Sequence, residues 1–441
     1  YALRGGLDFC VITDHGGPGH ERVLLSRAYP QLVQARKRHP EIVVFQGLEW
    51  NIPDAEHGSV IMPPSADEAQ LIADFESRYD STCTAKHEKP ARSEADAIAG
   101  VRYLQERAPG ALFFANHPAR RGLDSPHELR AWSDAGPDVT RGFEGAPGHG
   151  AAPKAGIPRG YYGQTPAARA HAAYPLHSYR TWGGYDYYTA QVGGLWDSLL
   201  GEGRPFYITA NSDAHRYLGD SQFVDRSTYH THGYVTADRH RTMPFDRHNP
   251  DEDYLPGTYA RTYVHAARRD PLAILSAMRA GNMWTVQGGL IAGFELYAHD
   301  ERHAAPMGST LLTTRGADVT VVVRVRPARQ RNLGNVLPLL HHIDLISGRI
   351  DEKSRDTNDR DSQYNATAQV VAQLPPEAGK RSGRDGEWLE FRHRFAKIDG
   401  SFYVRIRGTS SDVLSPRMDP LHLDPFEDLW FYGNPVMVRA A

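Results

Sequence analysis

Four stretches of the chain share one pattern, a short apolar run that ends in polar side chains able to bind a metal ion. They read LDFCVITDHG, EIVVFQGLEW, GALFFANHP and RPFYITANSDAH. Runs of this length without alternation predict short β-strands that are buried on both faces. The polar residues at their ends are, in chain order, Asp14, His15, Glu49, Asn116, His117, Asp213 and His215.

The segments between these strands carry helical patterns. In SEADAIAGVRYLQERAPG, Ser93 is a suitable N-cap, apolar residues recur at helical spacing, and Gly110 lies past the end. The segment ERVLLSRAYPQLVQARKRHP is a weaker helix because Pro30 should break or kink it. Alternating strands and helices are typical of a parallel α/β sheet or barrel, the fold class that we expect for residues 1–289.

The pattern changes beyond about residue 290. A helix in DPLAILSAMRAGN, with Asp270 as its cap and Gly281 past its end, closes the first region. Later segments such as ADVTVVVRVRP alternate apolar and polar positions, which predicts strands with one buried face. We therefore expect an all-β sandwich over residues 290–441 as a second domain.

Composition and charge narrow the classes of function. The chain has 441 residues, a length that favours two domains. Its 50 Lys and Arg against 53 Asp and Glu give a net charge of -3, so we expect no nucleic-acid or membrane partner. No apolar run approaches the roughly 18 residues of a spanning helix. Cys10 and Cys83 are too few for a disulfide framework or a thiolate metal site, and they leave the compartment open.

The chemistry of the strand ends follows from their residue types. In an α/β fold the strands deliver their C-terminal ends to one face, where catalytic groups gather. Imidazole and carboxylate donors without thiolates suit zinc, manganese or iron in a catalytic site with open positions. Glu49 can bridge two ions, which together lower the pKa of a shared water and hold both reacting oxygens of an ester.

We predict Glu49, His117 and Asp213 as the catalytic residues of this centre. Asp213 and His215 stand two residues apart, so both side chains lie on one side of an extended chain. His57, just after the second strand, offers a further nitrogen. The predicted metal ligands are Asp14, His15, Glu49, His57, His117, Asp213 and His215.

Each residue alone also has an ordinary structural explanation. Asp14 is a common helix N-cap, and His15 is a typical hydrogen-bonded loop residue. The NHP that contains His117 is typical of a turn. A capping role would not require histidine at three of the four strand ends, so the repetition favours a metal centre.

Taken in order, ITDHG, GLEW with the following EHGSVI, NHP and NSDAH resemble the successive metal-binding motifs of the PHP (polymerase and histidinol phosphatase) superfamily. The resemblance covers about the first half of the chain. It implies a distorted seven-stranded (β/α) barrel with two or three divalent ions, whose bound hydroxide attacks a phosphoester or, in some members, a carboxylic or carbamic ester or amide. The implied ligands, with Glu49 as the bridge, are His15, Glu49, His57, His117, Asp213 and His215.

The first motif of that family, a His-x-His on the strand before ITDHG, is missing from the printed sequence. We interpret YALRGGLDF as the helix that feeds the second strand, so that this motif and any leader peptide would precede Tyr1. The other interpretation is a chain that has lost two ligands and acts as a catalytically inactive binding module.

The stretch between the third and fourth strands is rich in Gly, Tyr and Arg, and we interpret it as loops that form the walls of a substrate site. Arg120, Arg121 and Arg216 are candidates to bind phosphate oxygens. His149 and His177 are candidates for the acid that protonates the leaving group. The expected function is a metal-dependent hydrolase of a small-molecule ester, a phosphoesterase first, with a carboxylic or carbamate ester hydrolase as the alternative.

Overall fold

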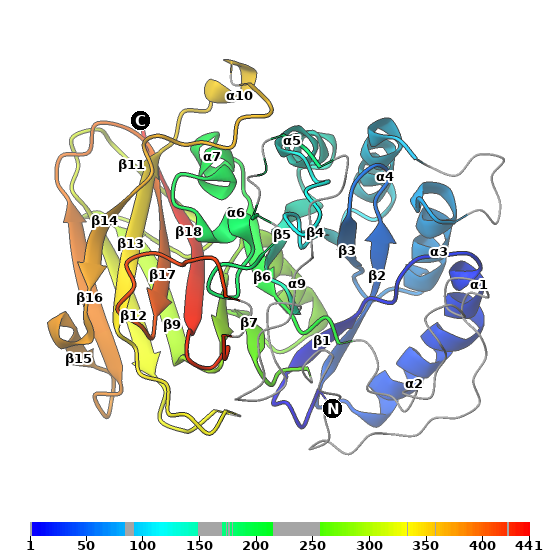
Figure 1. The fold of residues 1–441 in the computed structure, drawn as a ribbon, viewed down its shortest axis with the longest axis horizontal. Coiled ribbons are helices and arrows are strands. Elements are labelled where there is room, and N and C mark those ends of the chain that lie inside the picture. Colours follow the sequence, from blue (N-terminus) through cyan, green and yellow to red (C-terminus); the bar gives the residue numbers. More distant parts are fainter. Residues whose placement is uncertain are drawn as a thin grey trace.

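The computed structural model describes residues 2–83, 92–148, 170–172, 174, 177–178, 180–214, 256–332, 334–357, 359–420 and 423–441. These residues form three sheets (Figure 1). A six-stranded sheet with helices around it makes up the N-terminal half, and two further sheets make up the C-terminal half.

The N-terminal sheet has the strand order β1-β2-β3-β4-β5-β6. Its strands are β1 (Phe9–Ile12), β2 (Val43–Asn51), β3 (His57–Ile61), β4 (Leu112–Asn116), β5 (Thr140–Ala146) and β6 (Tyr207–Ala210). The pairs β1–β2, β4–β5 and β5–β6 are parallel, whereas β3 runs antiparallel to β2 and to β4. Consequently, β3 begins at the edge of the sheet where the other strands end.

The expected distorted (β/α)7 barrel, and with it the α/β fold class, is wrong. The described residues are dominated by β-sheets, and the six-stranded sheet is open, with β1 and β6 at its edges. The next strands along the chain are β7 (Ala260–Val264) and β8 (Met283–Gln287). They pair with each other, and β8 pairs with β18 (Trp430–Ala440), so they extend another sheet instead of closing a barrel.

Side chains meet the backbone of β6 at the place where a barrel would have another strand. The Ile208 amide donates to Oδ1 of Asn434 at 2.8 Å, and the Ala210 amide donates to Oγ1 of Thr262 at 2.8 Å. The Thr262 hydroxyl donates in turn to the carbonyl of Ala210 at 2.8 Å. The edge strand is therefore joined to the C-terminal sheet by side-chain hydrogen bonds.

The helices lie mainly in the N-terminal half (Figure 1). They are α1 (His20–Val23), α2 (Tyr29–Arg38), α3 (Glu68–Tyr79), α4 (Glu94–Arg107), α5 (Pro126–Ala135), α6 (Tyr187–Ala190), α7 (Leu195–Gly201), α9 (Pro271–Ala280) and α10 (Ser354–Thr357), with a 3-10 turn at Pro376–Ala378. In the described part of the chain, none of them has the length and apolarity of a membrane-spanning helix.

Three helix predictions can be compared directly with the structure. The N-cap at Ser93 is confirmed, because its hydroxyl accepts a hydrogen bond from the Asp96 amide in a capping box. The cap at Asp270 and the left-handed Gly281 after α9 are also confirmed. The break expected near Pro30 is a π-helical turn at Leu24–Ala28, and α2 continues directly from it with Pro30 as its second residue.

The two faces of the six-stranded sheet are covered differently. One face carries Leu48 and belongs to the large core that includes α3, α4 and α5. The opposite face carries Phe45 and Phe114, which form a smaller core with Met278 of α9. Because side chains alternate along a strand, Glu49 lies on the same face as Phe45. Helix α9 thus covers the apolar part of this face, and the polar strand ends lie at its edge.

Two layers form the C-terminal half, and their strand pairs are antiparallel except for β11–β18, which is parallel. The seven-stranded sheet has the order β14-β13-β17-β18-β8-β7, with β11 paired to β18, and the five-stranded sheet has the order β10-β9-β12-β16-β15. The strands not yet named are β9 (Ile291–His299), β10 (Ala304–Pro306), β11 (Thr310–Thr313), β12 (Val319–Pro327), β13 (His342–Arg349), β14 (Gln369–Leu374), β15 (Lys380–Ser382), β16 (Trp388–Phe395) and β17 (Phe402–Thr409).

The two C-terminal sheets share one apolar core. Phe294 of β9 contacts Phe431 of β18, with ring centroids 5.6 Å apart. The turn between β8 and β9 contains Gly288 and Gly289, both at positive φ. The predicted division of the chain into residues 1–289 and 290–441 falls at this turn and stays a prediction.

Candidate metal centre

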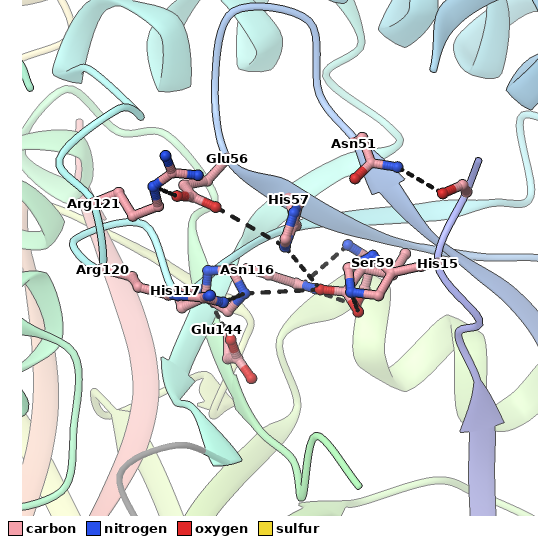
Figure 2. A network of polar contacts seen from close by, with 12 residues as sticks. His15, Asn51, Glu56, His57, Ser59, Asn116, His117, Arg120, Arg121 and Glu144 are labelled. Atoms are coloured by element: carbon pink, nitrogen blue, oxygen red, sulfur yellow. Dashed lines mark hydrogen bonds and ion pairs between the residues drawn. The ribbon is translucent and has the colours of Figure 1, made fainter. Parts of the chain in front are cut away.

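Polar residues of the N-terminal sheet gather at the edge where its parallel strands end (Figure 2). His15 follows β1, and its backbone pairs with that of Glu49 of β2 in an isolated parallel β-bridge. His57 is the first residue of β3 and lies opposite Asn116, the last residue of β4, with His117 next along the chain. The reversed direction of β3 is what brings His57 to this edge.

The carboxylate of Glu49 is at the centre of the group. Its Oε1 lies 3.2 Å from Nδ1 of His57 and 3.7 Å from Nε2 of His117, and its Oε2 lies 3.4 Å from Nε2 of His15. The side-chain amide of Asn116 donates to Oε1 at 3.3 Å. Glu49 is only 6% exposed, so three imidazoles surround a buried carboxylate.

The electrostatics of this group favour an ionised Glu49. Burial alone would raise the pKa of its carboxyl, but the three neighbouring imidazoles hold that pKa well below the ordinary value. For His57, burial lowers the pKa, and the carboxylates of Glu49 and Glu56 more than offset this, so its pKa lies above the ordinary value. His57 therefore holds its proton more strongly beside these carboxylates, and a divalent cation bound through its nitrogen would displace that proton.

Glu56 adds a second carboxylate beside the same imidazoles. Its Oε2 lies 3.9 Å from Nδ1 of His57. Ligand atoms of Glu56, His57 and His117 lie within 4.8 Å of one another, and so do those of His15, Glu49 and His57. His57 therefore belongs to two adjacent groups, each with two imidazoles and one carboxylate. This donor set fits zinc, manganese or iron.

The backbone is in an uncommon conformation at two of the strand ends. His117 has a φ of 32° and Asp213, after β6, has a φ of 45°, both in the left-handed region that non-glycine residues rarely adopt. The His117 amide donates to Oε2 of Glu144 on β5 at 2.8 Å. Burial and the charge of Asp213 raise the pKa of Glu144 well above its ordinary value. Such backbone outliers cluster at functional sites.

The structure brings together four of the predicted ligands, His15, Glu49, His57 and His117. Asp14 has an exposed side chain, and its carbonyl accepts a hydrogen bond from the Glu49 amide at 3.0 Å. Asp213 acts on Glu144 through its charge, and neither Asp14 nor Asp213 belongs to a three-residue group among the described residues. The predictions at His149, His215 and Arg216 lie outside the described residues.

The predicted substrate-binding residues differ in their surroundings. Nη1 of Arg120 lies 3.4 Å from Nε2 of His117, at the cluster itself. Arg121 instead forms an ion pair with Glu56, 3.2 Å from its Nε to Oε1 (Figure 2). His177 has an exposed side chain, and its carbonyl accepts a hydrogen bond from the Arg180 amide at 3.1 Å.

Sequence reasoning missed Glu56 and Glu144, and it noted Asn116 without giving it a role. Glu56 directly precedes His57, so its place beside a candidate ligand was a usable signal. Glu144 lies in RGFEGA, which we interpreted as loop, but these residues belong to β5 and are buried. A charged residue within a short apolar stretch was therefore the signal for a further strand of the site.

Comparisons with known proteins do not identify a family. No protein-family model matches the sequence, and no curated protein matches it. A solved structure described as a chitin binding domain from Burkholderia pseudomallei is similar over 30% of this chain, with 10% sequence identity and a TM-score of 0.16. The chain spans 57% of the length of that structure. At this TM-score the likeness indicates neither fold nor function.

Proposed function

We propose that the protein is a metal-dependent hydrolase of ester bonds and that phosphoric esters are its preferred substrates. The observation that carries the proposal is the convergence of His15, His57 and His117 on the buried carboxylate of Glu49. The resemblance of ITDHG, GLEW, NHP and NSDAH to PHP motifs supports the same class of reaction.

Two adjacent groups of donors favour a centre of two divalent ions, with a third if His215 contributes. The two groups share His57, whose Nδ1 lone pair could serve one ion only, while Glu49 has one oxygen near His15 and the other near His57 and could serve two ions. Bound ions of this type lower the pKa of a water ligand and polarise an ester oxygen. The carboxylate of the buried Glu144 accepts a hydrogen bond from the His117 backbone amide, and this bond helps to set the direction of the His117 ring.

Arg120 favours an anionic substrate. Its guanidinium is half-buried and lies beside His117, so its positive charge is part of the cluster. A guanidinium presents a planar fork of donors that matches two oxygens of a phosphate. The ion pair with Glu56 occupies Arg121, and we assign that residue to positioning Glu56.

The proposal is tested on the full chain, first stripped of metal by a chelator and then reloaded with Zn²⁺ or Mn²⁺. The substrates are p-nitrophenyl phosphate, bis-p-nitrophenyl phosphate and p-nitrophenyl acetate. We expect metal-dependent cleavage of a phosphate ester. Glu49→Gln should lower this rate by more than about a hundredfold, because loss of a mere outer partner of a ligand already costs about 10–100-fold.

Glu41→Gln is the matched control. Glu41 is exposed and pairs with His39 away from the cluster, so this variant should keep the rate of the unmodified chain. Cleavage of the acetate alone would contradict the preference for phosphate and indicate a carboxylic or carbamate ester hydrolase. A chain that binds metal and cleaves none of the three would be a binding module instead.

A further inference from the structure

A second group of metal-ligand side chains lies outside the strand-end cluster and shares no residue with it. His127 of α5, His171 and Asp361 offer ligand atoms within 4.8 Å of one another. Oδ1 of Asp361 lies 2.5 Å from Nδ1 of His127 and 3.3 Å from Nε2 of His171. The three side chains are 34%, 25% and 45% exposed, so the group is accessible to ions in solution.

The local structure fixes His127. It is the second residue of α5, and a capping box holds the first turn of this helix. The Ser125 hydroxyl accepts a hydrogen bond from the Glu128 amide at 3.2 Å, and the Glu128 carboxylate accepts one from the Ser125 amide at 2.8 Å. His127 therefore starts from a backbone that is ordered without any ion.

Asp361 and His171 are also held by their neighbours. The carbonyl of Arg360 accepts a hydrogen bond from Arg130 of α5 at 2.9 Å, and the guanidinium of Arg360 pairs with Asp134 of α5 at 3.0 Å. The His171 amide donates to the carbonyl of Gly122 at 2.8 Å. Three distant segments are thus fixed around one point before any ligand binds.

The outer partner of His127 has the geometry of a metal site. Glu94, the first residue of α4, places its Oε2 3.5 Å from Nε2 of His127, while Nδ1 faces Asp361. A metal-ligating imidazole commonly gives its second N–H to a carboxylate, which leaves the first nitrogen unprotonated for the ion. Zinc bonds of about 2.0–2.1 Å in a tetrahedron place ligand atoms about 3.3 Å apart. The spacing of His171 and Asp361 matches this, whereas the 2.5 Å contact of His127 with Asp361 is a hydrogen bond that must lengthen when an ion binds.

We propose that His127, His171 and Asp361 bind a divalent transition-metal ion, zinc in the first place, which ties α5 to the segment between β13 and β14. Two imidazoles and one carboxylate leave a fourth position for water. Neutral imidazoles with Asp361 and Glu94 carry a charge of -2, which a divalent cation neutralises. This inference does not depend on the proposed hydrolase function.

Binding would release protons that the group otherwise holds. Nδ1 of His127 and Oδ1 of Asp361 share a proton in their hydrogen bond. An ion that takes the Nδ1 lone pair must displace that proton. Because 234 residues separate His127 from Asp361 in the chain, the ion would also join segments far apart in sequence and stabilise the folded form.

The test is Zn²⁺ binding to the metal-free full chain, measured as bound ions per chain and as the shift in Tm. Asp361→Asn should bind one ion fewer than the unmodified chain. It should also lose a Zn²⁺-dependent rise in Tm of about 3 °C at a hundredfold excess over Kd. The matched control is Asp359→Asn. Asp359 lies in the same turn and accepts a 3.0 Å hydrogen bond from the Asp361 amide, and the side-chain oxygen of an asparagine can accept the same bond.

Glu94→Gln should have an intermediate affinity for Zn²⁺, a result that an ion-pair cluster without a metal site would not produce. It should weaken Zn²⁺ binding at this site by about 10–100-fold without removing it. Equal Zn²⁺ content and equal Tm shifts in the unmodified chain and Asp361→Asn would overturn the proposal. The group would then be an imidazolium held by two carboxylates. Glu49→Gln distinguishes the two sites, because it should leave this ion in place.

Discussion

Two buried carboxylates, Glu49 at the strand ends and Asp197 of α7, are stabilised in opposite ways. The two oxygens of Asp197 each accept a 2.7 Å hydrogen bond from Arg405, and the Tyr403 hydroxyl and the Gly193 amide donate to the same carboxylate at 2.9 and 2.7 Å. The imidazoles around Glu49 lie 3.2–3.7 Å away. Asp197 is held by short hydrogen bonds from a permanently charged partner, whereas Glu49 is surrounded by imidazoles that can give up their protons.

The largest effect that distinguishes the two regions is expected for Asp197→Asn. This change leaves the Arg405 guanidinium buried without a counter-charge, because arginine cannot release its proton. The free energy of unfolding should fall by about 3–5 kcal/mol. Urea unfolding at neutral pH measures it, and esterase kcat/KM per folded molecule should stay unchanged.

Glu49→Gln should have the opposite effect to Asp197→Asn, with activity lost and stability kept. It should remove activity while lowering the free energy of unfolding by no more than about 1 kcal/mol, since His57 can release its proton when the carboxylate is lost. If both variants lost stability equally, Glu49 would be a structural carboxylate like Asp197, and the contrast between the two regions would fail.

The next effect concerns the two adjacent arginines. Arg120→Ala should lower kcat/KM for p-nitrophenyl phosphate by about tenfold or more, because a hydrogen bond to a charged group contributes about 1.5–3 kcal/mol. Arg121→Ala breaks the ion pair with the buried Glu56 and should lower kcat/KM by about tenfold on the phosphate and the acetate alike, because it disturbs Glu56 and not the recognition of phosphate. Steady-state kinetics on the phosphate and the acetate measure both. An equal loss on the two esters in Arg120→Ala would mean that Arg120 does not recognise phosphate.

The smallest effect comes from a carboxylate that neutral donors satisfy. The Thr313 hydroxyl and the amides of Arg302 and His303 donate to Asp300 at 2.6, 2.8 and 2.7 Å, and they lower its pKa to about 2. Because this pKa is lower in the folded chain, the stabilisation is present above about pH 4 and is lost as the pH falls through about 2.

Urea unfolding of the unmodified chain and of Asp300→Asn from neutral pH down to about pH 2 tests this. The difference in free energy of unfolding between them should be largest at neutral pH and should shrink toward pH 2. A difference that does not depend on pH would show that Asp300 is not held as a charge.

The local parts of the fold could be predicted from the sequence, and its closure could not. The caps at Ser93 and Asp270 depend on residues three positions apart, so the pattern contains them. One partner of β8 is β18, far along the chain, and an apolar run looks the same whichever strand it pairs with. The short connection at residues 52–56 was a missed signal, because a hairpin-length link favours antiparallel strands.

The candidate site shows the same division. His15, Glu49 and His117 could be predicted because each directly follows or ends an apolar run. Glu144 was missed because a charged residue is ordinarily assigned to the surface, although its place within the short apolar stretch of β5 was a usable signal. The group of His127, His171 and Asp361 depends entirely on tertiary structure and leaves no pattern in the sequence.

The side chains of Thr262 and Asn434 form hydrogen bonds with the open edge of β6, and these bonds limit where the chain can be truncated. A truncated fragment that stops before β18 loses Asn434 and leaves the Ile208 amide open. An uncovered strand edge recruits strands from other molecules. The half that carries the strand-end histidines is therefore expected to aggregate when it is expressed without the last strand.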